Sequence, residues 1–166
     1  MLIREAKKNE FLLLKKQRLA SYKIYKEKLS SKQWAMLETH LSSDINHQPG
    51  VEVFVAEMDG QIVGSVALFP ADSKSYAGTS QAIECPEIRM LAVNPDFRSH
   101  GIGKLLVEHC IDISKIRKQK FIGLYTGCFM KHAIKLYEKM GFERISSLDF
   151  SPLDDGVFVK AFRFYL

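Results

Sequence analysis

Two glycines and an arginine stand close together in the middle of the chain, in the pattern Arg98-x-x-Gly101-x-Gly103. They follow a short apolar run, residues 87–93, which ends at an Asn-Pro turn signal, and they precede apolar residues at helical spacing. This order predicts a strand, a glycine-rich loop and a helix. Because glycine has no Cβ atom, a ligand can approach the loop closely, and the first N–H groups of a helix favour an anion. The loop is therefore predicted to cradle a phosphate.

Two common phosphate loops do not fit this stretch. A nucleotide-binding P-loop requires Gly-x-x-x-x-Gly-Lys-Ser/Thr, but Leu105 stands where the Ser or Thr should be. Arg98 also occupies the place of the first glycine of that motif. A dinucleotide-binding fingerprint needs a third glycine at position 106, which is a leucine here. Both classes of nucleotide site are therefore excluded.

The remaining pattern, Arg-x-x-Gly-x-Gly between a strand and a helix, resembles the acyl-CoA pyrophosphate loop of the GNAT superfamily of N-acetyltransferases. The resemblance extends to Leu91-Ala-Val-x-Pro95 before the loop. It also includes a second block further along, Ala133-x-x-Leu-Tyr137-Glu-Lys-x-Gly-Phe142. The loop alone is a weak signal, whereas both blocks in this order are a specific one. The resemblance covers nearly the whole chain, and its specific motifs lie within residues 87–142.

The resemblance implies that acetyl-CoA is the co-substrate and that no metal is needed. In the family, the pantetheine arm pairs with the strand before the loop, and the pyrophosphate accepts hydrogen bonds from the loop backbone. Whether the Arg98 and Lys104 side chains contact phosphate or solvent is left open. The cofactor-binding residues implied are Leu91, Ala92, Val93, Arg98, Ser99, His100, Gly101, Ile102, Gly103 and Lys104.

Acyl transfer to an amine requires that the acceptor lose a proton. A primary amine with a pKa of about 10.4 is neutral in only about one molecule in 2,500 at pH 7, and only the neutral form attacks a thioester. The resemblance implies that Tyr137 is the general acid for the CoA sulfur and that Glu87 is the general base, directly or through water. The alternatives are a core tyrosine and a solvated strand residue. Glu84, Tyr76 and a water chain ending at backbone carbonyls are the other candidates for the base.

Two residues that precede Tyr137 in the chain, Met130 and Cys128, affect this interpretation. The family commonly has asparagine three residues before Ala133, but this chain has Met130, which puts that polar contact with the cofactor in doubt. Neighbouring polar groups could compensate for it. Cys128 lies at a predicted strand end and would suit a covalent acyl-cysteine, but no His–acid pair is legible beside it, so direct transfer is favoured.

The other elements must position these residues. Apolar periodicity and turn signals predict the order β-α-α-β-β-β-α-β-α-β-β. Gly64 predicts a bulge or a close backbone approach, Gly141 a left-handed helix cap, and Ser31 the N-cap of the second helix. Strands are expected at residues 2–6, 51–56, 62–69, 87–93, 121–126, 142–145 and 157–164, and helices at 10–28, 32–42, 102–116 and 130–140.

The segment from residue 87 to residue 126 reads as a βαβ unit, which predicts a parallel crossover, and the remaining strands are expected to be antiparallel. An Asp-Gly pair at 59–60 predicts a hairpin turn. The expected fold class is α/β (α+β), with a mixed, mostly antiparallel GNAT-like sheet, a central βαβ acyl-CoA-binding unit and flanking helices. Residues 1–166 are expected to form a single GNAT-like domain.

The composition is typical of a globular protein, with 46% hydrophobic and 26% charged residues in a chain of 166. No apolar run is long enough to span a membrane and no secretory signal is legible, so a cytoplasmic protein without a membrane partner is expected. Cys85, Cys110 and Cys128 are odd in number and widely spaced, which argues against a disulfide framework or a zinc site. Cys110 is expected in the core.

The net charge of +5 is unevenly distributed. Residues 1–33 hold ten Lys or Arg against three Glu, and the rest of the chain holds fourteen against sixteen Asp or Glu. This basic N-terminal fifth of the chain favours an acidic partner, although a solvated helix face is the simpler explanation. Among nucleic acids, only aminoacyl-tRNA remains as a candidate acceptor.

The leading hypothesis is an acyl-CoA-dependent N-acyltransferase that moves acetyl directly to a primary amine of a small molecule or peptide. Residues 70–86 form a long polar loop that is expected to help build the acceptor site. The alternative is a non-catalytic acyl-CoA-binding or interaction module on the same fold, whose mark would be loss of Tyr137 or of the glycine loop. The acceptor, the acyl length and homodimer formation stay open.

Overall fold

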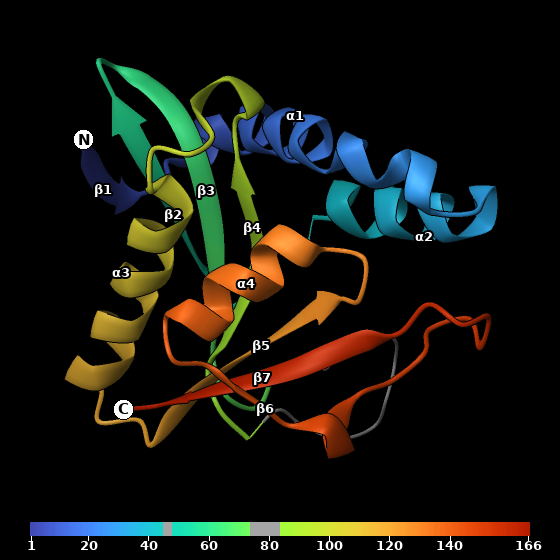
Figure 1. Cartoon of the computed structure of the whole chain (residues 1–166). Helices are drawn as coiled ribbons and strands as arrows, with labels where there is room; N and C mark the ends of the chain where they lie inside the picture. Colours follow the sequence, from blue (N-terminus) through green and yellow to red (C-terminus); the bar gives the residue numbers. More distant parts are fainter. Residues whose placement is uncertain (45–47, 74–83) are drawn as a thin grey trace. The chain divides into compact units, whose positions relative to one another are not determined.

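The computed structural model describes residues 1–44, 48–73 and 84–166. The strand order is β1-β2-β3-β4-β5-β7-β6 (Figure 1), with β4 and β5 parallel and the other recorded pairs antiparallel. The mixed, mostly antiparallel α/β fold expected from the sequence is thereby confirmed. The strands are β1 (Leu2–Glu5), β2 (Glu52–Met58), β3 (Gln61–Phe69), β4 (Glu87–Val93), β5 (Phe121–Gly127), β6 (Glu143–Arg144) and β7 (Val159–Tyr165), and the helices are α1 (Phe11–Tyr22), α2 (Ser31–Ser42), α3 (Ile102–Ile116) and α4 (Lys131–Lys139).

Residue contacts divide the chain into two compact units. Unit 1 contains residues 1–68 and 90–109, and unit 2 contains residues 69–89 and 110–166. Strand β4 and helix α3 therefore each begin in one unit and end in the other. The expectation of a single domain stays a prediction.

The hairpin between β2 and β3 has the predicted turn. Asp59 and Gly60 both have positive φ angles, 52° and 77°, as a type I′ turn requires. The register shifts within this hairpin, because Ala56 pairs with Gly64 whereas Glu57 pairs with Ile62. The bulge expected near Gly64 is thus confirmed.

Gly64 also permits the expected close approach. A Cβ atom at this position would lie 3.0 Å from Ile102 Cγ2, 3.1 Å from the Ala92 carbonyl oxygen and 3.2 Å from Leu106 Cδ1. We expect Gly64→Ala to lower the free energy of unfolding by about 1–3 kcal/mol, because a backbone carbonyl cannot shift as cheaply as a side-chain tip. Urea denaturation measures this change. An unchanged midpoint would contradict the prediction, because it would show that α3 can move away from the added methyl group with no loss of stability.

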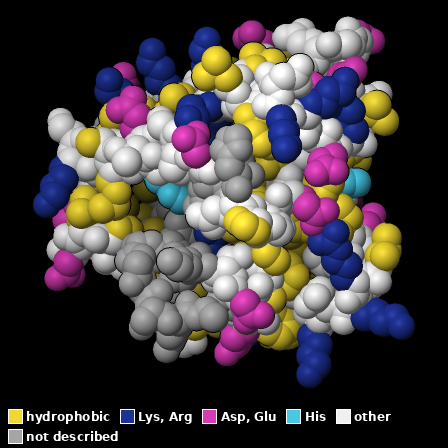
Figure 2. Space-filling view, turned by 180° about the vertical axis from the view of Figure 1, so that it is seen from behind, with side chains coloured by type: hydrophobic (Ala, Val, Ile, Leu, Met, Phe, Trp, Pro, Cys, Tyr) yellow, Lys and Arg dark blue, Asp and Glu magenta, His cyan; other side chains and the backbone are white. Residues whose placement is uncertain are grey.

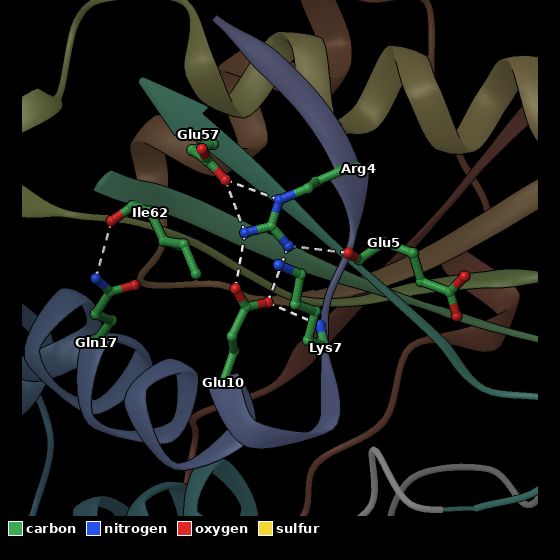
Figure 3. Close-up of polar contacts among 7 residues, drawn as sticks. All are labelled: Arg4, Glu5, Lys7, Glu10, Gln17, Glu57 and Ile62. Carbon is green, nitrogen blue, oxygen red and sulfur yellow. Dashed lines mark hydrogen bonds and ion pairs between the residues drawn. The ribbon is translucent and has the colours of Figure 1, made fainter. Parts of the chain in front are cut away.

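The N-terminus of unit 1 is fixed by a polar network around Arg4 (Figure 3). Its Nη2 atom lies 2.7 Å from Glu10 Oε1 and 2.7 Å from Glu57 Oε2, so it joins the start of α1 to β2. Further along α1, Gln17 Nε2 donates to the Ile62 carbonyl at 2.9 Å. These contacts fix the position of α1 along the strands of unit 1.

The Arg4–Glu10 pair predicts a loss of stability in acid. The hydrogen bond from Arg4 lowers the pKa of Glu10 from 4.5 to about 2. The folded state therefore binds fewer protons than the unfolded state between these values, so the stabilisation is present above pH 4.5 and is lost as the pH falls toward 2. Glu10→Gln should be less stable than the wild type at pH 7 and equal to it near pH 2 in thermal melts. A difference that is constant with pH would contradict this assignment.

The first helix is shorter than the apolar spacing predicts. It ends at Tyr22, and residues 23–28 continue as 3-10 turns, named η2. Five of the six η2 side chains are exposed, and a helix in a protein gains most of its stability by burying one face. The segment therefore lacks the packing that would hold it as an α-helix.

The N-cap of α2 is Ser30, not Ser31 as the sequence suggested. Ser30 Oγ accepts from the Gln33 N–H at 3.2 Å, and the Gln33 side chain accepts from the Ser30 N–H at 2.7 Å. This reciprocal pair is a capping box, whose signature is a Gln or Glu three residues after the cap. The spacing Ser30-x-x-Gln33 would have identified the cap correctly.

In unit 2, β7 pairs with β5 along the whole of both strands, and the start of β4 joins through Glu87↔Gly123 and Ile88↔Leu124. Cys110 and Ile122 are fully buried in this unit, so the core position expected for Cys110 is confirmed. The left-handed cap expected after α4 is present at Gly141, where φ is 94°.

The positive charge of residues 1–33 is partly balanced by acidic residues from elsewhere. Arg4 pairs with Glu57, and Lys15 Nζ lies 2.9 Å from Asp44 Oδ1. Lys and Arg side chains are interspersed with Asp and Glu on the face drawn in Figure 2. Among the described residues, no helix combines the length and apolar character needed to cross a bilayer.

Candidate active site

The glycine loop has the geometry expected of an anion cradle. Gly101 has a φ of 74°, and a Cβ atom built on it would meet nothing within 4 Å. The Leu105 N–H donates to the Gly101 carbonyl at 3.1 Å, which makes Gly101 the residue from which α3 starts. The N–H groups of residues 102–104 are therefore the first of the helix, where no preceding helical carbonyl is available to them. Open space beside such donors fits a pyrophosphate.

Two other loop residues hold this conformation. Ser99 has a φ of 66°, a left-handed value that is uncommon for a residue other than glycine. His100 Nδ1 donates to the Arg98 carbonyl at 2.8 Å and lies 3.1 Å from the Phe97 carbonyl. Since both partners are acceptors, Nδ1 carries the proton. His100 therefore braces the loop backbone, and its expected place beside the phosphate stays a prediction.

The two cations of the loop have partners within the protein. Arg98 Nη2 donates to the Ser21 carbonyl in the last turn of α1 at 2.7 Å. The exposed Lys104 lies 3.4 Å from Glu108 Oε1, one turn further along α3. The backbone of the loop is thus the better supported part of the predicted cradle. The contact between Arg98 and Ser21 has no signal in the sequence.

The strand before the loop offers one edge of its backbone away from β3. The Asn94 N–H donates to the Val63 carbonyl at 2.8 Å, and the Ala92 carbonyl faces Gly64. Because alternate residues of a strand direct their polar groups to opposite edges, those of Leu91 and Val93 point to the other edge. Met90, where φ is 55°, interrupts regular strand geometry just before them. The polar groups of Leu91 and Val93 thus lie on the edge away from β3, and their pairing with a pantetheine arm stays a prediction.

Tyr137, the predicted general acid, lies on α4 and is 6% exposed. Its ring centroid is 5.7 Å from that of Phe142 and 6.4 Å from that of Phe162. The Tyr137 carbonyl accepts from the Phe142 N–H at 3.0 Å, and the Glu138 carbonyl accepts from the Gly141 N–H at 3.1 Å. These two hydrogen bonds form a Schellman cap. The block from Ala133 to Phe142 therefore fixes the tyrosine through both its ring and its backbone.

Glu87, the predicted base, is 1% exposed and forms an ion pair. Its Oε1 atom accepts from Arg89 Nε at 2.7 Å, and Arg89, itself 3% exposed, places its guanidinium carbon 4.2 Å from the centroid of the Phe69 ring. Burial raises the pKa of Glu87, and the charge and hydrogen bond of Arg89 oppose that rise. The structure therefore excludes the alternative of a solvated strand residue. Sequence reasoning missed Arg89, although the spacing Glu-x-Arg in a strand places both on one face.

The candidate acid and base lie on opposite faces of the sheet in unit 2. Glu87 pairs with Gly123, whereas Phe162, against which Tyr137 packs, pairs with Leu124. Since neighbouring residues of a strand point to opposite faces, Glu87 and Tyr137 do not share a face. The two proton-carrying groups are therefore separated by the strands.

A second group missed by sequence reasoning surrounds Glu87. A Cβ atom at Gly123 would lie 3.1 Å from Cys85 Sγ, so the glycine leaves room for that buried thiol. Burial raises the pKa of Cys85 to about 11. The pKa of Tyr125 is also raised, first by burial and then by the negative charge of Glu87. Tyr125 is half-buried, so it is the most accessible of the three side chains Glu87, Cys85 and Tyr125.

The remaining sequence-derived candidates are placed as follows. Met130 stands at the N-cap of α4, where it provides no side-chain cap and its sulfur accepts from Thr126 Oγ1 at 3.6 Å. Cys128 is partly exposed, and its N–H donates to the Phe158 carbonyl at 2.9 Å. Glu84 lies at the surface, 3.3 Å from Arg163 Nη2. Tyr76 and most of the 70–86 loop lie outside the described residues. In the part of the chain that is described, no group of His, Cys, Asp and Glu side chains is arranged to hold a metal.

Solved structures with a similar fold include proteins described as acetyltransferases. An acetyltransferase of the GNAT family from Staphylococcus aureus superposes with a TM-score of 0.72 and 20% identity, covering 99% of this chain and 98% of that one. An acetyltransferase from Bacillus anthracis in complex with acetyl coenzyme A superposes with a TM-score of 0.56 and 22% identity over 72% of this chain and 65% of that one. These likenesses show the fold.

Sequence comparison shows the family. An uncharacterized N-acetyltransferase from Methanocaldococcus jannaschii is 36% identical over 90 residues, which are 54% of this chain and 38% of that protein. The chain thus spans less than two thirds of the length of this curated relative. The sequence profile of the Acetyltransferase (GNAT) family matches residues 17–142, a range that includes both the glycine loop and Tyr137. The chain therefore belongs to the GNAT family of acetyltransferases.

Proposed function

We propose that this protein is an acyl-CoA-dependent N-acyltransferase that moves acetyl from acetyl-CoA directly to a primary amine. The observation that carries the proposal is the glycine loop. It combines a left-handed Gly101, open space beside it and the first N–H groups of α3, in a chain of the GNAT family. Acetyl-CoA, when bound, would supply a thioester whose carbonyl carbon is attacked by the amine.

Binding of the donor is assigned to unit 1. The backbone of residues 101–104 would hold the pyrophosphate, and the outward edge of β4 at Leu91 and Val93 would pair with the pantetheine arm. Lys104, being exposed and only loosely paired with Glu108, would add positive charge.

Proton transfer is assigned to Tyr137 and Glu87, which lie on opposite faces of the sheet and would each have to reach the thioester from its own side. Glu87 would receive the proton that the ammonium must lose, and Tyr137 would give one to the thiolate released as the carbon–sulfur bond breaks and the carbon–nitrogen bond forms. A burial-raised pKa brings Glu87 nearer to the range in which a general base works well at neutral pH. Because Glu87 is almost inaccessible, its proton would arrive through water and not directly from the amine.

The test of this assignment is Tyr137→Phe. We expect kcat to fall about a hundredfold, because a positioned general acid typically contributes at least that much, while the KM for acetyl-CoA stays within about twofold. Steady-state kinetics with acetyl-CoA and a panel of amines, with release of free thiol as the readout, measures both constants. Tyr165→Phe removes a hydroxyl from an exposed tyrosine of β7 and serves as the matched control. A wild-type rate in Tyr137→Phe would remove the acid role.

One observation favours the alternative of a non-catalytic acyl-CoA-binding module. Glu87 is buried and paired with Arg89, which leaves the candidate base without direct access to an acceptor. The amine panel distinguishes the two functions, because measurable CoA binding with no thiol release from any amine would support the binding module. Turnover of even one amine would exclude it.

The acceptor class is proposed no more narrowly than the amines on which the family acts. One neighbour in fold is the ribosomal-protein-S18-alanine N-acetyltransferase of Escherichia coli, which superposes with a TM-score of 0.69 at 18% identity. A panel that contains amino acids, polyamines, aminoglycosides and peptides with free N-termini therefore covers both small-molecule and protein acceptors.

A further inference from the structure

The last turn of α1 makes three hydrogen bonds to residues of the proposed donor site. Ser21 Oγ lies 2.8 Å from the Val93 carbonyl and 2.9 Å from the Gln17 carbonyl of its own helix, so these two acceptors share its one proton, and Tyr22 Oη donates to the Leu91 carbonyl at 3.0 Å. In return, Arg98 Nη2 donates to the Ser21 carbonyl at 2.7 Å. Both Ser21 and Tyr22 are buried. We call this set of four contacting groups, Ser21, Tyr22, the Leu91–Val93 edge and Arg98, the α1 junction.

The α1 junction meets β4 on the edge that is proposed to hold the donor. The carbonyls of Leu91 and Val93 point away from β3, on the same edge as the N–H groups of those two residues. Two hydroxyls from α1 hold these carbonyls, and therefore fix the tilt of the peptide groups along this edge. A ligand that pairs with the edge meets donors whose direction α1 has set.

Arg98 is well suited to hold the helix in place. Its guanidinium lies at the C-terminal turn of α1, where the helix dipole favours a positive charge. Burial raises the pKa of Tyr25 in η2, and the positive charge of Arg98 opposes that rise, so the arginine lies near the segment that continues α1. Further back in the helix, Gln17 bonds to the Ile62 carbonyl of β3. The end of α1 is thus held in two ways. Arg98 of the loop donates to its backbone, and its Ser21 and Tyr22 hydroxyls contact carbonyls of β4.

We propose that Arg98 is a positioning residue that acts through α1 and is not a ligand of the pyrophosphate. It holds the last turn of α1 against β4, and this contact sets the edge with which the pantetheine arm pairs. Binding of the donor to that edge in turn orders α1 and η2. This inference rests on the proposed function for the identity of the donor, and on the observed contacts for the junction itself.

Two ligands that share the pantetheine arm and its thiol, but of which only one carries the phosphorylated nucleotide, separate the two roles of Arg98. Coenzyme A and pantetheine, which lacks the whole phosphoadenosine diphosphate part, would be titrated against wild type, Arg98→Gln and Tyr22→Phe. A positioning role predicts that Arg98→Gln weakens both ligands by the same factor, about tenfold for one lost charged hydrogen bond, and that Tyr22→Phe does so to a smaller extent. Loss of affinity for coenzyme A alone would show that Arg98 is a phosphate ligand and would overturn the proposal. Lys16→Ala, which removes an exposed charge from α1, is the control.

Hydrogen exchange of the ligand-free protein tests the junction without any donor. In Arg98→Gln and Tyr22→Phe, amides of residues 11–28 should exchange faster than in wild type, while those of β7 should be unchanged. Unchanged exchange over residues 11–28 in both variants would refute the junction. If wild type binds no coenzyme A, the proposed function fails, but these exchange rates still decide whether Arg98 positions α1. Tyr22→Phe removes only one hydroxyl and should fold. The junction can therefore still be tested if the arginine variant does not fold.

Discussion

Replacing Gly101 by glutamate is expected to weaken coenzyme A binding at least about a hundredfold. A Cβ atom at Gly101 meets no neighbour, so the effect does not come from a clash within the protein. It has two other sources. The φ of 74° strains any residue with a side chain, and the carboxylate would stand where a pyrophosphate is proposed to bind. Two negative charges about 4 Å apart repel by about 4 kcal/mol at a protein surface, which is more than a hundredfold in affinity.

Isothermal titration with coenzyme A measures this effect, and two variants separate its causes. Gly101→Ala carries the backbone strain without the charge, so it should lose much less affinity. Gly156→Glu adds the same charge at a glycine with a φ of 87° and equally open surroundings, but in unit 2 and outside the glycine loop. It should bind coenzyme A as the wild type does. Unchanged affinity in Gly101→Glu would refute the cradle.

Replacing Arg89 by methionine should lower the free energy of unfolding by about 3–5 kcal/mol at neutral pH. This variant leaves the Glu87 carboxylate buried with no partner, and breaking one side of a buried ion pair has a cost of this size. It also removes the guanidinium that lies over the Phe69 ring. Urea denaturation of the variant and the wild type gives the difference.

The pH dependence distinguishes a lost charge partner from simple loss of packing. Burial raises the pKa of Glu87, and Arg89 opposes the rise, so Arg89→Met should raise that pKa further. The folded variant then binds more protons than the unfolded chain above pH 4.5, and its stability falls as the pH rises. The deficit relative to wild type should therefore be smaller at pH 5 than at pH 7.5. The double variant Glu87→Gln/Arg89→Met should recover part of the loss, and an equal deficit at both pH values would contradict this account.

The elements around the donor loop could be predicted because their signals are local. The apolar run of β4, the glycines after it and the periodic helix α3 specify one another within a short stretch, and the turn at Asp59-Gly60 depends on two residues alone. The cap at Gly141 is of the same kind. In each case the residue types restrict the backbone directly, so no knowledge of distant residues is needed.

The partners of the site residues were not predictable in the same way. The hydrogen bond from Arg98 to Ser21 joins residues 77 positions apart, and its acceptor is a backbone carbonyl that any residue would provide. Nothing in the side chain at position 21 encodes it. The end of α1 at Tyr22 is similar, because the helix stops where there is nothing left to bury, which depends on the tertiary structure. The Glu87–Arg89 pair is an intermediate case, since its spacing was legible but its burial was not.

The burial of the cysteines makes a thiol-release assay practical for this protein. The described structure has two buried thiols, and a third, Cys128, that is partly exposed. With its pKa raised to about 11, Cys85 is a thiolate in only about one molecule in a thousand at pH 8, so it reacts slowly with a disulfide reagent. The folded protein should therefore contribute at most about one reactive thiol per chain to the signal of the reagent. Cys128→Ser should remove this background. Any further thiol that appears with time then reports either released coenzyme A or unfolding, and a blank without amine separates the two.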